Sequence, residues 1–416
     1  MLSTTGGQPC QAAAAFPPSV PASHLRQGFW GISLRKLLIA LVLVLAGAVT
    51  ATLAYAPYLP QLVAEGVPPL IWPAPGHFAS IKGAATPRDL HVADTASTRP
   101  LQPDLEAAFT EKRGKALLVA RAGRLELEHY APGLTAETRF NSFSMAKSLV
   151  GALIYKALAE GRLKNLDQTL GELLPDDRGL AGVTLGALLA MRSGIAFDHG
   201  EGKAGAVSGD KTVDTSANPF GPLARLHFLG LGAIEGGLVT DARTASAFNY
   251  QNVNTALLGE VLETVYGQGL EHLLAEKLWR PAGAASAAWR QPAAGAPVSA
   301  YCCIYATARD WIRIGQYLIE NGTPEAPFLP TPLWREFLGL DVGTTARLKD
   351  NYGQHLRQNV LDRAGQALQG PFTYLMGQGG QVLYLLPEQQ LVVYRAGETV
   401  QLLHSTLYGA WNSISR

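Results

Sequence analysis

The stretch Phe143-Ser144-Met145-Ala146-Lys147-Ser148 places a serine and a lysine three residues apart. An apolar run follows at nearly helical spacing: Leu149, Val150, Ala152, Leu153, Ile154, Ala157 and Leu158. This periodicity predicts a buried helix that begins near 142–144. Because positions i and i+3 share one helix face, we expect Ser144 and Lys147 to point into the same cavity. A lysine one turn beyond a serine is an arrangement that makes the hydroxyl nucleophilic without a histidine.

Two other Ser-x-x-Lys sequences occur, from Ser33 to Lys36 and from Ser208 to Lys211. A chain of this length shows about one or two such matches by chance. The first precedes a long apolar run, and the second is followed by residues typical of a loop. Only Ser144 opens a buried helix, so we interpret Ser144 as a nucleophile with Lys147 beside it. The alternative is a helix-capping serine next to a solvated lysine.

The N-terminal residues suggest a membrane segment. Residues 1–36 are polar and contain no acid, and Arg35 and Lys36 directly precede an uncharged run. Residues 37–56 form a span of about 20 residues, enough for a helix to cross a bilayer. The basic flank predicts a cytoplasmic leader, a single-pass inner-membrane anchor and a catalytic domain in the periplasm or another extracytoplasmic space. The alternatives are a signal peptide cleaved after Ala54-Tyr55-Ala56 and a buried core helix.

The composition suits a large folded domain. Apolar residues make up 47% of the chain and charged residues 16%, and the net charge of +1 argues against a nucleic-acid partner. There are three cysteines, Cys10 and the adjacent pair Cys302 and Cys303. Because sequence neighbours rarely bridge, we expect no structural disulfide.

Strand patterns stand at both ends of the main domain. The proline-rich residues 57–104 are predicted to be a linker with little regular structure, and 105–416 the folded domain. Helical patterns dominate from about 160 to 300. The predicted strands are 116–120, 125–130, 372–376, 381–386 and 391–395. This order of strand and helix patterns along the chain predicts an α/β (α+β) fold. Strands from both ends of the domain would form one antiparallel sheet with flanking helices, and a mostly helical subdomain would be inserted between them.

Two further elements supply candidate site groups. Tyr250-Gln251-Asn252 is the only Tyr-x-Asn sequence in the chain. A phenol beside a cationic lysine can shuttle a proton, and Asn252 can position the lysine or the substrate. The alternatives are a packing role for Tyr250, or Ser216-Ala217-Asn218 as the second element.

A glycine-rich stretch precedes the strand at 381–386. It reads Gly377-Gln378-Gly379-Gly380-Gln381, and glycines at a strand edge permit close backbone approach to a ligand. One N–H from Gln378, Gly379 or Gly380, together with the N–H of Ser144, would form an oxyanion hole. The alternative is an ordinary turn between strands.

Other chemistries find little support. No Gly-x-Ser-x-Gly elbow, phosphate-binding loop, dinucleotide fingerprint or His-Glu-x-x-His sequence occurs. The nine histidines are scattered, and we interpret His129 and His404 as structural. The sequence therefore predicts no cofactor and no metal site. The oligomeric state stays open, and a polar loop predicted at 196–222 would shape the substrate pocket.

Taken in order, Ser144-x-x-Lys147, Tyr250-x-Asn252 and Gly379-Gly380 resemble the serine hydrolases related to class C β-lactamases and penicillin-binding proteins. The resemblance covers roughly residues 105–412. Supporting stretches are 140–148, 188–194, 278–281 and 306–311. The runs Gly379-Gly380-Gln381 and 302–311 resemble in particular the 6-aminohexanoate-oligomer hydrolase and esterase branch.

The resemblance implies an acyl-enzyme mechanism. Ser144 would attack a carbonyl carbon, while Lys147 and Tyr250 share its proton and Asn252 positions groups. Members of the family usually carry Lys or His two residues before the glycine of the third motif, where it helps receive a substrate carboxylate. This chain has Gly377 there, which favours an esterase or amidase for small, less acidic substrates. The alternatives are a β-lactamase or D-Ala-D-Ala carboxypeptidase, and an inactive membrane-anchored binding domain.

Overall fold

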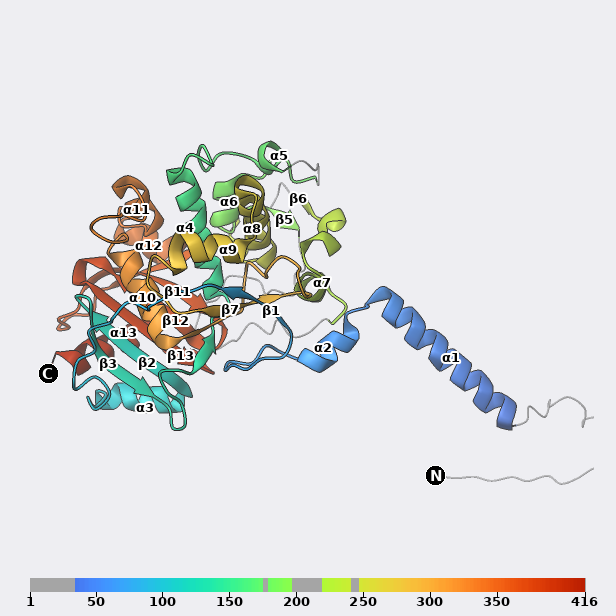
Figure 1. The fold of residues 1–416 in the computed structure, drawn as a ribbon, viewed down its shortest axis with the longest axis horizontal. Helices are drawn as coiled ribbons and strands as arrows, with labels where there is room; N and C mark the ends of the chain where they lie inside the picture. The colour runs from blue at the N-terminus through green and yellow to red at the C-terminus, as the bar shows by residue number, and fades with distance from the viewer. Residues whose placement is uncertain (1–33, 175–178, 197–218, 241–246, 416) are drawn as a thin grey trace, which may run out of the picture. The chain divides into compact units, whose positions relative to one another are not determined.

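The computed structural model describes residues 34–174, 179–196, 219–240 and 247–415, in two compact units. The first unit, Met1–Tyr55, contains α1 (Leu34–Tyr55), a helix of 22 residues with a mean hydropathy of 2.6 and no buried residue (Figure 1). Its length and composition would allow it to cross a membrane, and it overlaps the predicted span at 37–56. The greater part of the predicted leader lies outside the described residues.

The second unit, Ala56–Arg416, contains the remaining elements. Its helices are α2 (Leu59–Glu65), α3 (Pro103–Glu111), α4 (Met145–Ala159), α5 (Leu170–Leu173), α6 (Leu185–Leu189), α7 (Pro222–Leu229), α8 (Asn252–Tyr266), α9 (Leu270–Leu274), α10 (Ala308–Ile319), α11 (Thr331–Phe337), α12 (Thr344–Asp350) and α13 (Leu403–Ile414). Its strands are β1 (His77–Ile81), β2 (Gly114–Arg121), β3 (Arg124–Tyr130), β4 (Arg139–Asn141), β5 (Ile195–Ala196), β6 (Val239–Thr240), β7 (Ala287–Gln291), β8 (Ile304–Thr307), β9 (Tyr352–Gly353), β10 (Leu356–Leu361), β11 (Gly370–Gly377), β12 (Gln381–Leu386) and β13 (Leu391–Gly397).

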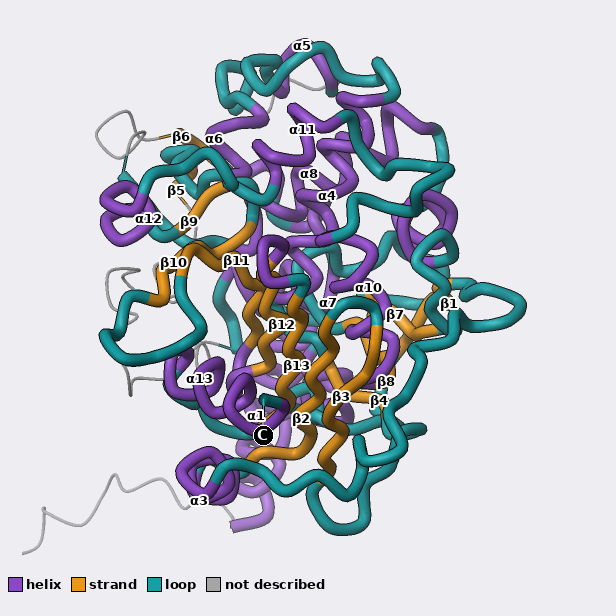
Figure 2. Tube along the Cα trace, turned by 90° about the vertical axis from the view of Figure 1, so that its left-hand side faces the viewer, coloured by secondary structure: helices purple, strands orange, loops and turns teal. Residues whose placement is uncertain are grey.

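A seven-stranded antiparallel sheet joins the two ends of this unit, as the sequence predicts. Its order is β3-β2-β13-β12-β11-β10-β9, and Figure 2 shows β12, β13, β2 and β3 side by side. The join is the pairing of β2 with β13, in which Leu118 lies opposite Tyr394. The β2–β3 turn at Ala122 and Gly123 has positive φ at both residues, as a tight two-residue hairpin requires.

The sheet is buried on both faces. Along β2, Leu118 and Ala120 join the core that includes residues of α4, α8 and α10, whereas Leu117 and Val119 join the core beneath α3 and α13. Strands covered on both faces are apolar at successive positions, which explains the continuous apolar run of β12. On α10, a Cβ at Gly315 would lie 2.4 Å from Val392 Cγ1, so this helix approaches the sheet as closely as a glycine allows.

A second, four-stranded sheet of order β1-β7-β8-β4 was not predicted. It includes part of the segment 57–104, for which the sequence predicts a linker without regular structure. In the structure this segment carries α2 and β1, and Glu65 of α2 forms a buried ion pair with Arg290 (Oε2 to Nη2, 2.8 Å). The prolines interrupt the helical and strand patterns, so the sequence does not reveal β1. In the structure, β1 pairs with β7, which lies more than 200 positions later in the chain. The region from about 160 to 300 contains α5–α9 and three short strands.

Candidate active site

Ser144 lies at the N-terminal cap of α4, directly after a turn fixed by buried polar groups. Phe143, the residue before it, has φ +43°, a conformation that non-glycine residues seldom adopt. The backbone N–H of Phe143 donates to Asn141 Oδ1 at 2.8 Å. Asn141 is itself fully buried and donates through Nδ2 to Tyr305 Oη at 3.0 Å and to Pro69 O at 3.2 Å. These contacts hold the uncommon backbone conformation and so set the position of the serine.

Lys147 is buried and makes three hydrogen bonds, one of them to Ser144. Its Nζ donates to Ser144 Oγ at 3.0 Å, to Asn252 Oδ1 at 2.6 Å and to the Tyr301 carbonyl at 3.1 Å. Asn252 is the first residue of α8, which packs against α4. The structure therefore brings Ser144, Lys147 and Asn252 together. The Tyr301 carbonyl, which no sequence motif marks, completes the set.

This geometry suits proton transfer from the serine. A neutral lysine amine has two N–H donors and one lone pair. If the two donors of the neutral amine go to Asn252 and the Tyr301 carbonyl, the 3.0 Å contact to Ser144 Oγ reverses its direction, and the lone pair accepts the hydroxyl proton. In the described part of the chain, no carboxylate forms an ion pair with Lys147.

Tyr250 meets the lysine through its ring face. Lys147 Nζ lies 4.9 Å from the Tyr250 ring centroid, and the Tyr250 and Tyr352 rings are edge-to-face at 6.0 Å. Between described residues, the Tyr250 hydroxyl makes no hydrogen bond to Ser144 or Lys147. The described contact is between the amine and the ring face, and the sharing of the Ser144 proton by Lys147 and Tyr250 that the resemblance implies stays a prediction.

The glycine-rich stretch forms the hairpin turn between β11 and β12. Gln378 is exposed, and Gly379 and Gly380 have φ of 72° and 77°. None of the three lines the cleft at Ser144. The adjoining Gly377 does contact the nucleophile turn, because a Cβ there would lie 2.2 Å from Ser142 O. Any larger residue would clash with this backbone atom unless the backbone shifted.

The cleft at Ser144 is small, with a volume of about 10 Å³. Several of the residues that line the cleft match no sequence motif. They come from β9, β10, β11 and the β9–β10 turn. The cleft is lined by Ser144, Lys147, Ser148, Tyr250, Tyr352, His355, Arg357, Tyr374 and Met376.

His355 fastens the β9–β10 hairpin to the helices around the cleft. Its Nδ1 donates to Leu189 O at 3.0 Å, so its Nε2 accepts from Thr255 Oγ1 at 3.0 Å. Its own carbonyl accepts from Ser148 Oγ at 2.6 Å. Burial lowers the pKa of His355 to about 3, against the opposing effect of the Leu189 carbonyl, and the nearby charge of Lys147 lowers it further. The imidazole is therefore neutral and serves as a fixed clamp.

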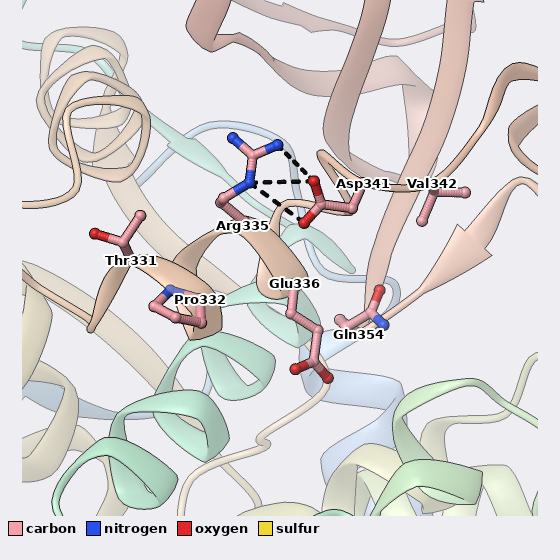
Figure 3. Close-up of a pocket in the computed structure, with 8 residues that line it drawn as sticks. Thr331, Pro332, Arg335, Glu336, Asp341, Val342 and Gln354 are labelled. Carbon is pink, nitrogen blue, oxygen red and sulfur yellow. Dashed lines mark hydrogen bonds and ion pairs between the residues drawn. The ribbon is translucent and has the colours of Figure 1, made fainter.

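A second hollow, of about 570 Å³, lies at α11 and the residues that follow it (Figure 3). Arg335 and Asp341 face each other there in an exposed ion pair, and Glu336 accepts a hydrogen bond from Tyr155 Oη at 2.8 Å. None of the candidate site residues lines this hollow. Nor do the described residues contain a group of three or more His, Cys, Asp or Glu side chains placed to hold a metal ion.

The expectation of no disulfide is wrong. Cys302 and Cys303 are bonded to each other, next to the Tyr301 carbonyl that receives Lys147. Cys303 has φ +72°, and this turn brings the two sulfurs together in a way that sequence spacing does not reveal. The rival elements at 208–211 and 216–218, and most of the predicted loop 196–222, lie outside the described residues.

Comparison with known proteins identifies the family. A family model described as Beta-lactamase matches residues 103–396. A 6-aminohexanoate-dimer hydrolase of Paenarthrobacter ureafaciens is 27% identical over 271 residues, which are 63% of this chain and 66% of that protein. Penicillin-binding protein 4 of Amycolatopsis lactamdurans is 28% identical over 155 residues, which are 36% of each chain. The matches thus span just under two thirds of one relative and about a third of the other.

The fold also resembles that of solved structures with related names. The solved structure of a Bacillus anthracis protein, provisionally named a 6-aminohexanoate-dimer hydrolase, superposes with a TM-score of 0.62 at 17% identity. The superposition covers 82% of this chain and 89% of that one. These findings confirm the predicted fold class and the resemblance drawn from the three motifs.

Proposed function

Because this chain belongs to the β-lactamase family, we propose that it is a serine hydrolase that cleaves carboxylic ester or short amide bonds through an acyl-enzyme on Ser144. The observation that carries the proposal is the 3.0 Å contact between Lys147 Nζ and Ser144 Oγ. The amine is held at its other two positions by Asn252 and the Tyr301 carbonyl. A nucleophile and a base within hydrogen-bond reach, with the base oriented by further groups, is the arrangement that covalent catalysis requires.

The proposed reaction has two halves. Ser144 Oγ attacks the carbonyl carbon while its proton passes to the neutral amine of Lys147. The N–H of Ser144 at the start of α4 and one N–H from Gln378 to Gly380 hold the oxyanion, the latter from a turn that does not line the cleft but adjoins the residues before Ser144 through Gly377. Collapse of the tetrahedral intermediate expels the alcohol or amine, which takes the proton from Lys147. Water then attacks the acyl group with Lys147 again as base, and Lys147 returns that proton to Ser144 Oγ as the acyl–Oγ bond breaks and the acid is released.

The test is covalent labelling of the full-length protein with a fluorophosphonate, measured by intact mass. We expect one label on the wild type and none on Ser144→Ala. Ser208→Ala is the matched control, because Ser208 begins another Ser-x-x-Lys sequence, and it should label normally. Labelling that survives Ser144→Ala would move the nucleophile elsewhere. An unlabelled wild type would instead support the inactive binding domain.

A second candidate is a β-lactamase or D-Ala-D-Ala carboxypeptidase, which the penicillin-binding relative favours. We prefer the esterase or amidase, because Gly377 has no side chain to present a cation at the position of the third motif where such enzymes usually carry one. A chromogenic cephalosporin and short 4-nitrophenyl esters separate the two. Faster turnover of the cephalosporin would reverse the preference.

We also propose that α1 anchors the protein in the inner membrane, with residues 1–36 in the cytoplasm and the catalytic domain in the periplasm. Its length and apolar composition support the anchor, and the basic pair Arg35 and Lys36 supports the orientation. The protein should then resist extraction by alkaline carbonate and dissolve in detergent. Added protease should digest the catalytic domain in spheroplasts. Extraction without detergent would contradict the anchor.

A further inference from the structure

Arg357 is a cation in the catalytic cleft that the proposed mechanism does not use. It lies on β10, opposite Tyr374 of β11, and both residues line the cleft together with Ser144. The cleft thus carries a cationic group besides the amine of Lys147, contributed by a different part of the fold.

The guanidinium is held in place by aromatic rings. Arg357 Cζ lies 5.6 Å from the ring centroid of Tyr250 and 5.6 Å from that of Tyr352. Two residues before it, His355 fastens the β9–β10 turn through Leu189, Thr255 and Ser148. The position of Arg357 relative to Ser144 is therefore set by the clamped hairpin and the two rings rather than by an ion pair.

Its hydrogen-bond donors remain uncommitted. Among the described residues, Arg357 forms neither an ion pair nor a hydrogen bond. Several other partly or fully buried arginines do have such partners. Arg309, for example, donates through Nη2 to Glu128 at 2.6 Å, and Arg395 donates through Nε to Gln401 at 3.0 Å. An arginine fork that is partly buried, fixed and unpaired beside a nucleophile is suited to bind a planar anion two donors at a time.

We propose that Arg357 binds a carboxylate of the substrate, so that the preferred substrates are esters or short amides that carry a free carboxylate near the scissile bond. This inference rests on the proposed function and revises the expectation of less acidic substrates. Gly377 excludes a cation from β11, and the neighbouring strand β10 provides one instead. Arg357 would be a specificity-determining residue and would take no part in proton transfer.

Two matched pairs of probes test the proposal. The first pair is 4-nitrophenyl hexanoate and mono-4-nitrophenyl adipate, which differ by a carboxylate on the acyl side. The second pair is phenyl acetate and 3-acetoxybenzoate, which differ by a carboxylate on the leaving group. The variants are Arg357→Gln and Arg357→Lys. Arg121→Gln is the control, because Arg121 also lies over an aromatic ring, with its Cζ 4.3 Å from the Trp411 centroid, but does not line the cleft.

In at least one pair, Arg357→Gln should lower kcat/KM for the anionic member by about 10- to 100-fold, mainly through KM, because a charge-assisted hydrogen-bonded pair is lost. The neutral member should change by less than about threefold. Arg357→Lys should retain part of the preference, and Arg121→Gln all of it. Equal losses on neutral and anionic members, or no loss on either, would overturn the proposal.

Fluorophosphonate labelling is run on the same samples to separate the two levels of the argument. If the wild type labels at Ser144 and hydrolyses neutral probes but shows no dependence on Arg357 for the anionic ones, only the carboxylate site fails. If the wild type neither labels nor hydrolyses any of the four probes, the proposed function itself fails.

Discussion

The two hollows of the catalytic unit differ in size and in chemistry. The cleft at Ser144 measures about 10 Å³, whereas the hollow at α11 measures about 570 Å³. In the small cleft a serine, a lysine and an unpaired arginine meet. In the large hollow, Arg335 and Asp341 form an ion pair with each other (Figure 3). The candidate catalytic groups thus lie in the small cleft, where polar groups converge on a buried amine, and the larger volume of the other hollow does not coincide with them.

The largest effect is expected at the amine of the small cleft. Lys147→Met keeps most of the length of the side chain but removes the base, so kcat/KM for 4-nitrophenyl butyrate should fall by about 10²- to 10⁴-fold. Ester hydrolysis is measured across pH, with circular dichroism to check folding. Lys156→Met, in the last turn of the same helix and outside the cleft, should leave the rate unchanged. A folded Lys147→Met enzyme with near wild-type activity would remove the lysine from the mechanism.

A smaller effect is expected where β11 touches the nucleophile turn. Gly377→Ala adds a methyl group 2.2 Å from Ser142 O, so the backbone must shift. Overpacking of this kind costs about 1–3 kcal/mol, and movement of Ser144 should lower kcat more than it raises KM. Urea unfolding and ester kinetics measure the two effects. Gly182→Ala, which meets nothing within 4 Å, is the control. Unchanged kinetics would show that the turn tolerates the displacement.

His355 should contribute a pH-dependent part of the stability. Its folded pKa of about 3 lies below the ordinary value of 6.5, so it stabilises the fold above pH 6.5 and progressively less as the pH falls toward 3. The loss approaches about 1.4 kcal/mol per pH unit within that window. His355→Asn should be less stable at pH 7, and the difference from the wild type should shrink on acidification.

Urea unfolding at several pH values measures this difference. His91→Asn, at an exposed position, serves as the control and should follow the wild type. A constant gap between the wild type and His355→Asn across this range would contradict a neutral, buried imidazole.

The smallest effect is expected in the large hollow. Arg335→Gln breaks an exposed ion pair, and such pairs contribute little to stability. Ester kinetics should stay within about twofold of the wild type, and the thermal midpoint should hardly change. A marked loss of activity would contradict the assignment of the reaction to the small cleft alone and would indicate that the large hollow takes part in it.

Local pattern predicted the main sheet and the nucleophile helix. The apolar spacing after Ser144 placed α4 to within a few residues, and the apolar runs at 381–386 and 391–395 placed β12 and β13. The second sheet was missed, because its strands are only three to five residues long and β1 follows a proline-rich stretch. Its pairing of β1 with β7 depends on contacts between distant segments, which carry no local signal.

The sequence by itself determined that a serine and a lysine share one helix turn, because helix periodicity brings i and i+3 together. It also placed Tyr250 and Asn252 in the order that the family uses. Only the tertiary structure decided what surrounds the amine. Lys147 meets Asn252 across 105 positions and the Tyr301 carbonyl across 154. The clash at Gly377, the bonded Cys302–Cys303 pair and the placement of Arg357 likewise follow from three-dimensional packing, because each depends on backbone geometry or on contacts between separate elements.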